Sequence, residues 1–224
     1  MSLLSRMAGI KILLVGLVVL TGLPSWAEPI DTGHSKNPVV LVIGDSISAG
    51  FGVPVQQGWV TLFQQQLQQR VPHVTVVNAS ISGDTTQGGV ARLPALIQSH
   101  QPDLLIIELG GNDGLRGTSL SVIRSNLERM ITMAEHEGIM VMLLGMQIPP
   151  NYGSRYTEGF ANIYSELANQ QETLLLPFLL EGIATQPELM QADGIHPATA
   201  AQPMMSTAVI DALDIWIQFV NNEL

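Results

Sequence analysis

Cysteine is absent from the 224-residue sequence, so no disulfide bond can stabilise the fold and no thiol can take a lipid anchor. Positive charge is also scarce. Nine Lys and Arg stand against nineteen Asp and Glu, a net charge of −10, which excludes the basic face that nucleic-acid binding requires. Charged residues make up 12% and apolar residues 46%, which excludes disordered and fibrous proteins and supplies one large core. The length fits one domain, or at most two small ones.

The amino-terminal end lacks an apolar run long enough for a membrane anchor. Residues 12–23 are apolar, whereas a membrane-spanning helix needs about 18–20 such residues. Arg6 and Lys11 precede this run, and the small-x-small sequence SWA (25–27) follows it, as is typical of a secretory signal peptide. We therefore expect a cleaved signal peptide over residues 1–27. The mature chain, 28–224, is expected to be a single soluble domain that is periplasmic or secreted and has no stable membrane anchor.

Short apolar runs alternate with segments of helical spacing along the rest of the chain. The runs are continuous rather than alternating, as in strands buried on both faces of a parallel sheet. They cover residues 39–43, 74–78, 104–109, 139–145 and 173–177. Helical spacing runs from Trp59 to Leu67, from Val90 to Ile97 and from Ile123 to Ala134, and further helices are expected at 154–170 and 198–219. Five β–α units predict an α/β fold, a three-layer α/β/α sandwich with a five-stranded parallel sheet.

Polar and glycine-rich motifs follow the predicted strands. In such folds ligands bind beyond the carboxyl ends of the strands, so these motifs should converge on one edge of the sheet. They are GDS (44–46), NASISGDTT (78–86), GGNDG (110–114) and, before the last helix, DGIHP (193–197). Each motif alone also has a structural interpretation as a turn or a helix cap.

Together the motifs contain the residue types that acyl transfer needs. Ser46 can serve as a nucleophile if a neighbouring base removes its proton. His196 suits that task, since an unperturbed imidazole is mostly neutral at pH 7, and Asp193 can hold the imidazole in the required tautomer. The backbone N–H groups of Ser46 and Gly83 and the side-chain amide of Asn112 could stabilise the oxyanion.

These motifs resemble, in order, the four signature blocks of the SGNH (or GDSL) hydrolase superfamily. The stretches VVNASISGDTT (76–86), ARLPALIQSHQPDLLIIELGGNDGLRG (91–117) and PPNYGSRYTEGFANIY (149–164) look like its bacterial periplasmic thioesterase I / lysophospholipase / arylesterase branch. The resemblance implies a flavodoxin-like fold with strand order 2-1-3-4-5. It implies a triad of Ser46, Asp193 and His196 and an oxyanion hole of Ser46, Gly83 and Asn112. It also implies hydrolysis of fatty acyl thioesters, lysophospholipids and simple esters with no metal or other cofactor.

Several other acidic residues sit beside these motifs. Asp45, Asp84 and Asp113 are expected to fix loop geometry rather than to react. Glu108 lies at the end of a buried strand, where a carboxylate needs a partner. We expect Arg116 to be that partner.

The sequence therefore predicts a secreted serine ester and thioester hydrolase. Its expected partner is a small-molecule acyl ester or thioester, and the protein is expected to be a monomer. Loops after the third and fourth strands should form an apolar groove for the acyl chain. A carbohydrate O-deacetylase on the same fold and a non-catalytic periplasmic binding protein stay open as alternatives. A flavodoxin-like nucleotide binder is a third, although no GxGxxG or P-loop sequence supports it.

Overall fold

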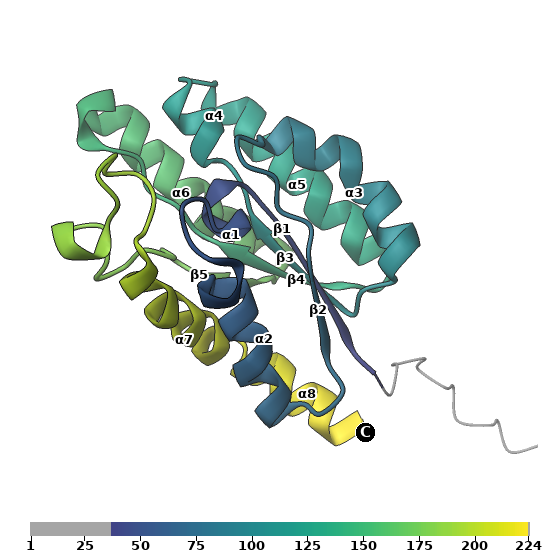
Figure 1. The fold of residues 1–224 in the computed structure, drawn as a ribbon. Helices are drawn as coiled ribbons and strands as arrows, with labels where there is room; N and C mark the ends of the chain where they lie inside the picture. The colour runs from purple at the N-terminus through teal and green to yellow at the C-terminus, as the bar shows by residue number, and fades with distance from the viewer. Residues whose placement is uncertain (1–36, 224) are drawn as a thin grey trace, which may run out of the picture. The chain divides into compact units, whose positions relative to one another are not determined.

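A five-stranded parallel sheet forms the centre of the computed structural model, which describes residues 37–223 (Figure 1). The strands are β1 (Val39–Gly44), β2 (Thr75–Asn78), β3 (Leu104–Glu108), β4 (Met140–Leu144) and β5 (Leu174–Leu176). Their order is β2-β1-β3-β4-β5, and every neighbouring pair is parallel. The predicted fold class, strand positions and strand order are confirmed.

The continuous apolar runs arise because both faces of the central strands are covered. Side chains alternate between the two faces of a strand. Val40 and Val42 of β1 therefore join one buried cluster, whereas Leu41 and Ile43 join the other. The central strand β3 is buried over its whole length, and the edge strands β2 and β5 are only partly buried.

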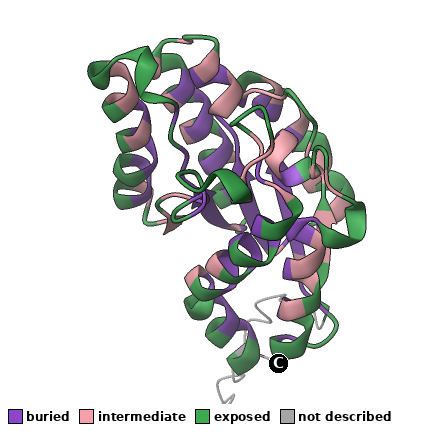
Figure 2. Cartoon of the chain, turned by 60° about the vertical axis from the view of Figure 1, so that its left-hand side comes forward, coloured by how far each residue is buried: buried purple, intermediate pink, exposed green. Residues whose placement is uncertain are grey.

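Helices cover the two faces as two separate layers. The longer helices are α2 (Trp59–Arg70), α3 (Thr86–His100), α5 (Leu120–His136), α6 (Ser154–Gln171), α7 (Gln202–Ala212) and α8 (Asp214–Glu223). Apolar residues of α2, α7 and α8 pack in the cluster on one face, and those of α3, α5 and α6 pack in the cluster on the other. Figure 2 shows buried residues along the strands and along the helix faces turned toward them.

Short helices and turns connect these elements. They are α1 (Ser46–Ala49), α4 (Gly111–Leu115) and the 3₁₀ turns η1 (Val55–Gln57), η2 (Pro150–Tyr152), η3 (Pro187–Leu189) and η4 (Thr199–Ala201). Helix α1 follows β1 directly and α4 follows β3, so both lie at the carboxyl ends of central strands. Two of the predicted motifs, GDS and GGNDG, thus lie at the starts of helices that follow neighbouring strands of the sheet.

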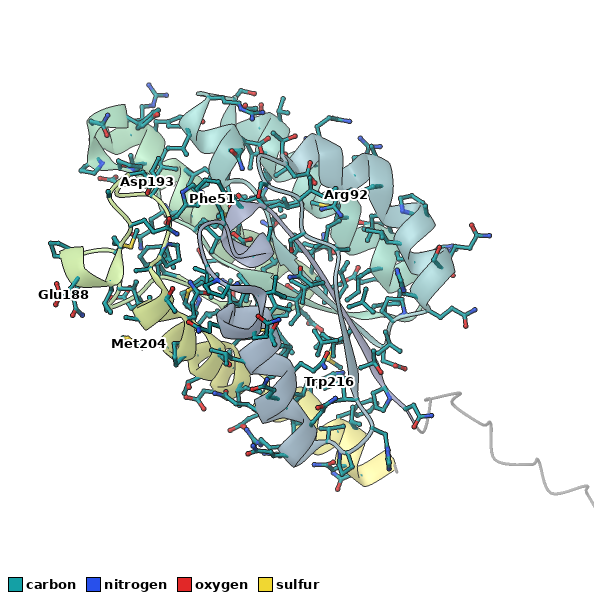
Figure 3. The ribbon with its side chains drawn as sticks, in the orientation of Figure 1. Phe51, Arg92, Glu188, Asp193, Met204 and Trp216 are labelled. Carbon is teal, nitrogen blue, oxygen red and sulfur yellow. The ribbon has the colours of Figure 1, made fainter. Side chains whose placement is uncertain are left out.

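The single helix predicted over residues 198–219 is wrong. The segment instead forms η4, then α7, which ends before Leu213, and then α8. The bend lets apolar residues of both helices reach the same core, and Trp216 on α8 is only 1% exposed (Figure 3). Packing of these large side chains explains a break that helical spacing alone does not reveal.

The predicted signal peptide, residues 1–27, lies outside the described residues. All described elements, within residues 37–223, belong to one compact unit of the chain. Within the part of the chain that the structure describes, no helix combines the length and apolar character needed to cross a membrane.

Candidate active site

Ser46 is the first residue of α1, immediately after β1. Asp45 precedes it as the helix N-cap, and its Oδ1 accepts a hydrogen bond from the Ile47 N–H at 3.0 Å. The first N–H groups of a helix have no acceptor within the helix, so the Ser46 N–H is available to an incoming group. The end of a buried strand and a capped helix start therefore fix both the Ser46 hydroxyl and its backbone N–H.

His196 and Asp193 reach Ser46 from the loop before η4. His196 Nε2 lies 2.8 Å from Ser46 Oγ, and its Nδ1 lies 2.7 Å from Asp193 Oδ2. An ionised carboxylate only accepts hydrogen bonds, so Nδ1 carries the hydrogen and Nε2 accepts from the serine hydroxyl. The three side chains form one continuous hydrogen-bonded chain.

The Asp193 carboxylate is held in its ionised form by the loop that it caps. Its Oδ1 accepts the N–H of His196 at 3.0 Å and that of Ile195 at 2.9 Å. Hydrogen bonds from the backbone and side chain of His196, with the Ile195 N–H, lower the pKa of Asp193 from 3.8 to about 2. Asp193 is therefore an acceptor for the imidazole across the whole physiological pH range.

Phe51 and Gln191 fix the histidine loop from the other side. The Phe51 ring lies with its centroid 4.6 Å from that of the His196 imidazole. Gln191 donates its side-chain amide to the carbonyls of Phe51, at 2.7 Å, and Pro197, at 3.1 Å, and its N–H donates to the His196 carbonyl at 2.8 Å. Figure 3 shows Phe51 and Asp193 at the same end of the sheet.

Asn112 extends from α4, beyond the end of β3. Its Nδ2 donates to Asp45 Oδ2 at 3.0 Å, so the amide is anchored to the residue next to Ser46. The turn into α4 uses Gly110 with φ of +125°, and a Cβ there would lie 2.3 Å from the hydroxyl of buried Tyr164. Glycine is therefore required where the chain leaves β3 for this helix.

Gly83 lies in a turn to which Arg92 and Arg116 donate hydrogen bonds. The Asp84 N–H donates to the Ile81 carbonyl at 3.0 Å, and Gly83 between them has φ of +82°, as glycine in such turns allows. Arg92 of α3 donates to Asp84 Oδ2 at 2.7 Å and to the Ala79 carbonyl. At the first residue of the turn, the Ile81 N–H donates to the carbonyl of Gly44 at 3.0 Å. This bond connects the loop to the end of β1.

A buried polar cluster joins the loop of Gly83 to the helix of Asn112. Asp113 accepts the N–H of Thr86 at 2.8 Å and its hydroxyl at 2.7 Å, and Asn126 of α5 donates to the same hydroxyl at 3.0 Å. Asp84 and Asp113 thus bond to loop and helix residues, as predicted, and Asp45 does the same at α1.

The expected pairing of Glu108 with Arg116 is wrong. Arg116 Nη2 donates instead to the carbonyl of Gly83 at 3.2 Å. Glu108 Oε2 accepts the hydroxyl of Ser48 at 2.6 Å and the N–H of Asp45 at 3.1 Å. Gly44 makes room for this arrangement, because a Cβ there would lie 2.6 Å from Glu108 Oε2.

Burial, rather than a cation, dominates the electrostatics of Glu108 and favours its protonated form. Complete burial, followed by the nearby charge of Asp45, raises the pKa of Glu108 well above its usual value. Burial also raises the pKa of Asp45 from 3.8 to about 6, although the Ile47 N–H, the His196 charge and the Asn112 amide oppose the increase. Burial therefore favours the neutral form of Glu108, whereas Asp45 is charged above about pH 6.

A cavity of about 490 Å³ lies on the loops after β3 and β4. It is lined by Leu120, Tyr152, Gly153, Ser154, Arg155 and Tyr156. Neither Ser46 nor His196 belongs to its lining, so it does not by itself form the predicted acyl groove. Apolar surface lies nearer the candidate site. The exposed side chains of Phe51, Ile81 and Ile195 belong to the same segments as Ser46, Gly83 and His196.

The structure thus brings Ser46, His196 and Asp193 into direct contact, and it links Asn112 to the serine segment through Asp45. Arg116, which directly follows the helix of Asn112, donates to the Gly83 carbonyl and connects the two segments. The sequence interpretation missed the contacts of Phe51, Gln191 and Asp45 with these residues. Only the position of Asp45, between a buried strand and Ser46, gave a signal that could have drawn attention to it.

Comparison with known proteins decides the family. Residues 42–202 match the model of the GDSL-like lipase/acylhydrolase family, and this span contains all five predicted site residues. The chain belongs to that family. It is a hydrolase, and the predicted superfamily is confirmed.

Two bacterial enzymes have similar sequences over most of their length. The chain is 54% identical over 174 residues to esterase TesA of Pseudomonas aeruginosa, a match that covers 78% of this chain and 87% of the relative. It is 42% identical over 167 residues to thioesterase 1/protease 1/lysophospholipase L1 of Escherichia coli strain K12, which covers 75% and 79%. The crystal structure of the psychrotrophic esterase EstA from Pseudoalteromonas sp., inhibited by monoethylphosphonate, matches with a TM-score of 0.76 and 34% identity and covers 80% of this chain and 98% of that one.

Proposed function

We propose that this hydrolase cleaves acyl esters and thioesters through a covalent intermediate on Ser46. The observation that carries the proposal is the hydrogen-bonded chain from Ser46 Oγ to His196 Nε2 and from His196 Nδ1 to Asp193. This arrangement matches what nucleophilic catalysis by a serine requires. The relatives named as esterase and as thioesterase and lysophospholipase support the same reaction class.

The proposed reaction begins with attack of Ser46 Oγ on the acyl carbon while His196 Nε2 accepts the hydroxyl proton. Asp193 accepts the Nδ1–H and stabilises the positive charge that forms on the ring. The N–H groups of Ser46 and Gly83 and the Asn112 amide donate to the oxyanion. His196 then gives the proton to the leaving alcohol or thiol. A water molecule, deprotonated by the same imidazole, releases the acid and regenerates the serine.

The substrate is proposed to carry an apolar acyl chain. Phe51, Ile81 and Ile195 are 53%, 54% and 41% exposed, and large apolar side chains on a surface favour contact with an apolar ligand. Their position in the segments of the site residues supports acyl binding beside Ser46. The signal-peptide pattern supports action outside the cytoplasm, and a monomeric state stays a prediction.

A chain-length series of p-nitrophenyl esters, with matched acyl thioesters, tests this function. We expect turnover of acyl chains longer than acetyl, and we expect Ser46→Ala and His196→Ala each to lower kcat by about 10⁴–10⁶-fold. Asn112→Ala should lower it by about 10²–10³-fold. Hydrolysis limited to acetyl esters would favour the carbohydrate deacetylase, and normal hydrolysis by Ser46→Ala would rule out the mechanism.

A further inference from the structure

A buried carboxylate connects the proposed nucleophile to a proposed oxyanion donor. Asp45 is 2% exposed and lies between β1 and α1. One of its oxygens accepts the N–H of Ile47 at 3.0 Å, and the other accepts Nδ2–H of Asn112 at 3.0 Å. One side chain thus fixes both the start of the helix that carries Ser46 and the amide that extends from α4.

The hydrogen-bonding capacity of Asn112 suits this arrangement. A side-chain amide nitrogen has two hydrogens, and the bond to Asp45 uses one of them. The second remains for an oxyanion, and the first bond limits rotation of the amide. A donor held in advance stabilises developing charge far better than one that must reorient.

We propose that Asp45, in its ionised form, is a positioning residue that orients the Asn112 amide toward the oxyanion. The inference rests on the proposed function, because that function assigns Asn112 to the oxyanion hole. In this role Asp45 acts through Asn112. Protonation of Asp45 turns an acceptor into a potential donor and weakens the restraint on the amide.

The surroundings of Asp45 raise its pKa toward neutral pH. The titratable and charged groups that face it are Glu108 from β3, Asp84 and Arg92 from the loop and helix after β2, Tyr164 from α6, and His196 from the loop before η4. Complete burial raises the pKa of Glu108 well above its usual value, which favours the neutral form of this group beside Asp45. With a pKa of about 6, Asp45 is ionised at neutral pH and protonated in mild acid.

A double-mutant cycle on kcat for p-nitrophenyl ester hydrolysis tests the proposal. Asp45→Asn keeps an oxygen for the Ile47 N–H but places an –NH₂ group against the Asn112 amide. We expect this variant to lower kcat by about 10–100-fold with little change in KM, a smaller loss than removal of the donor itself. In the Asn112→Ala background, Asp45→Asn should change kcat by less than about 3-fold, because the amide on which it acts is gone.

Multiplied losses in the double variant would overturn the proposal. They would mean that Asp45 acts through the charge on His196 or through the start of α1 instead of through Asn112. Asp103→Asn is the matched control, since Asp103 accepts the Val39 N–H at 2.7 Å at the opposite edge of the sheet and should leave kcat unchanged. Ser46→Ala tests the proposed function independently. Loss of activity in that variant supports the function, whatever result the cycle gives for Asp45.

The pH profile supplies a second test that does not depend on the folding of Asp45→Asn. Protonation of Asp45, whose pKa is about 6, should weaken the restraint on the Asn112 amide, so the ratio of wild-type kcat/KM to that of Asn112→Ala should fall as the pH decreases through about pH 6. In Asn112→Ala the proton on Asp45 should no longer affect catalysis. A ratio that stays constant across this pH range would contradict the proposal.

Discussion

At the scale of single residues, the imidazole of His196 is restrained on three sides. Ser46 and Asp193 occupy its two nitrogens, and the Phe51 ring lies beside it. The side chain of His196 is 17% exposed, whereas Phe51 is 53% exposed. Phe51 therefore forms more of the protein surface at this contact than His196 does. An aromatic ring within about 6 Å of a cation attracts it, so we expect Phe51 to favour the protonated imidazole that the proposed proton transfer would form.

Replacement of Phe51 by Leu should therefore lower kcat. A cation–π contact at an exposed site contributes about 0.5–1 kcal/mol, which corresponds to about 2–5-fold in rate. Phe51→Tyr should retain most of the activity, because its ring attracts a cation as well. Steady-state kinetics with one p-nitrophenyl ester measures the effect.

Phe219→Leu is the matched control, because Phe219 is 36% exposed and lies on α8. It should leave kcat unchanged. A Phe51→Leu enzyme as active as the wild type would mean that the ring contributes apolar surface only and does not favour the charged imidazole.

At the scale of elements, the starts of α3 and α4 are joined by side chains rather than by the sheet. The Thr86 hydroxyl donates to Asp113 of α4 and accepts from Asn126 of α5. All three side chains are buried, so each hydrogen bond that is lost leaves a polar group without water. The relative position of the Gly83 loop and Asn112 depends on this cluster.

Thr86→Val should accordingly lower the free energy of unfolding by about 2 kcal/mol, since it keeps the shape of the side chain and leaves two buried partners incompletely bonded. For a chain of this size the midpoint of thermal unfolding should fall by about 4–8 °C. Thr61→Val is the control, because the Thr61 hydroxyl donates to the Val55 carbonyl in an exposed bond of 2.8 Å. Its effect should stay within about 0.5 kcal/mol, and equal shifts in the two variants would contradict the role of the cluster.

At the scale of the whole molecule, the raised pKa of Glu108 links folding to pH. A carboxyl group whose pKa is higher in the folded protein takes up a proton on folding. Its contribution to stability is complete below its usual pKa, near 4.5, and is lost as the pH rises toward the folded value. The site therefore contains a buried acid that makes the fold less stable as the pH increases.

Glu108→Gln should remove this pH dependence, because the amide has a similar shape and does not titrate. Between the usual pKa, near 4.5, and the higher folded pKa, the free energy of unfolding of the wild type, relative to that of the variant, should fall by about 1.4 kcal/mol per pH unit. Urea unfolding of both proteins between pH 4.5 and pH 7.5 measures the difference. Parallel pH dependences would show that Glu108 ionises normally.

Much of the fold could be predicted because its cause is local. A parallel strand buried on both faces needs a continuous apolar run, and the five runs lie where the five strands form. The rule that strand ends meet at one edge associated Ser46 with Gly83 and Asn112, whereas His196, which lies well beyond β5, was assigned from its residue type and from the resemblance. The resemblance supplied the strand order, which no single run contains.

What could not be predicted depends on packing between distant segments. The break between α7 and α8 follows from how Trp216 and its neighbours fill the core. Glu108 was assigned a cation because a buried acid needs a partner, yet Ser48 and the Asp45 N–H supply its hydrogen bonds and burial keeps its proton. The contact of Phe51 with His196 joins residues 145 positions apart, and no sequence motif records it.

The central claim is that Ser46 forms the covalent acyl intermediate. The most direct measurement is intact-protein mass spectrometry after incubation with a fluorophosphonate, followed by peptide mapping. We predict one adduct per chain, located on Ser46, with no adduct in Ser46→Ala and much slower labelling of His196→Ala. An adduct on another residue, or an unmodified wild-type protein that still hydrolyses esters, would contradict the account.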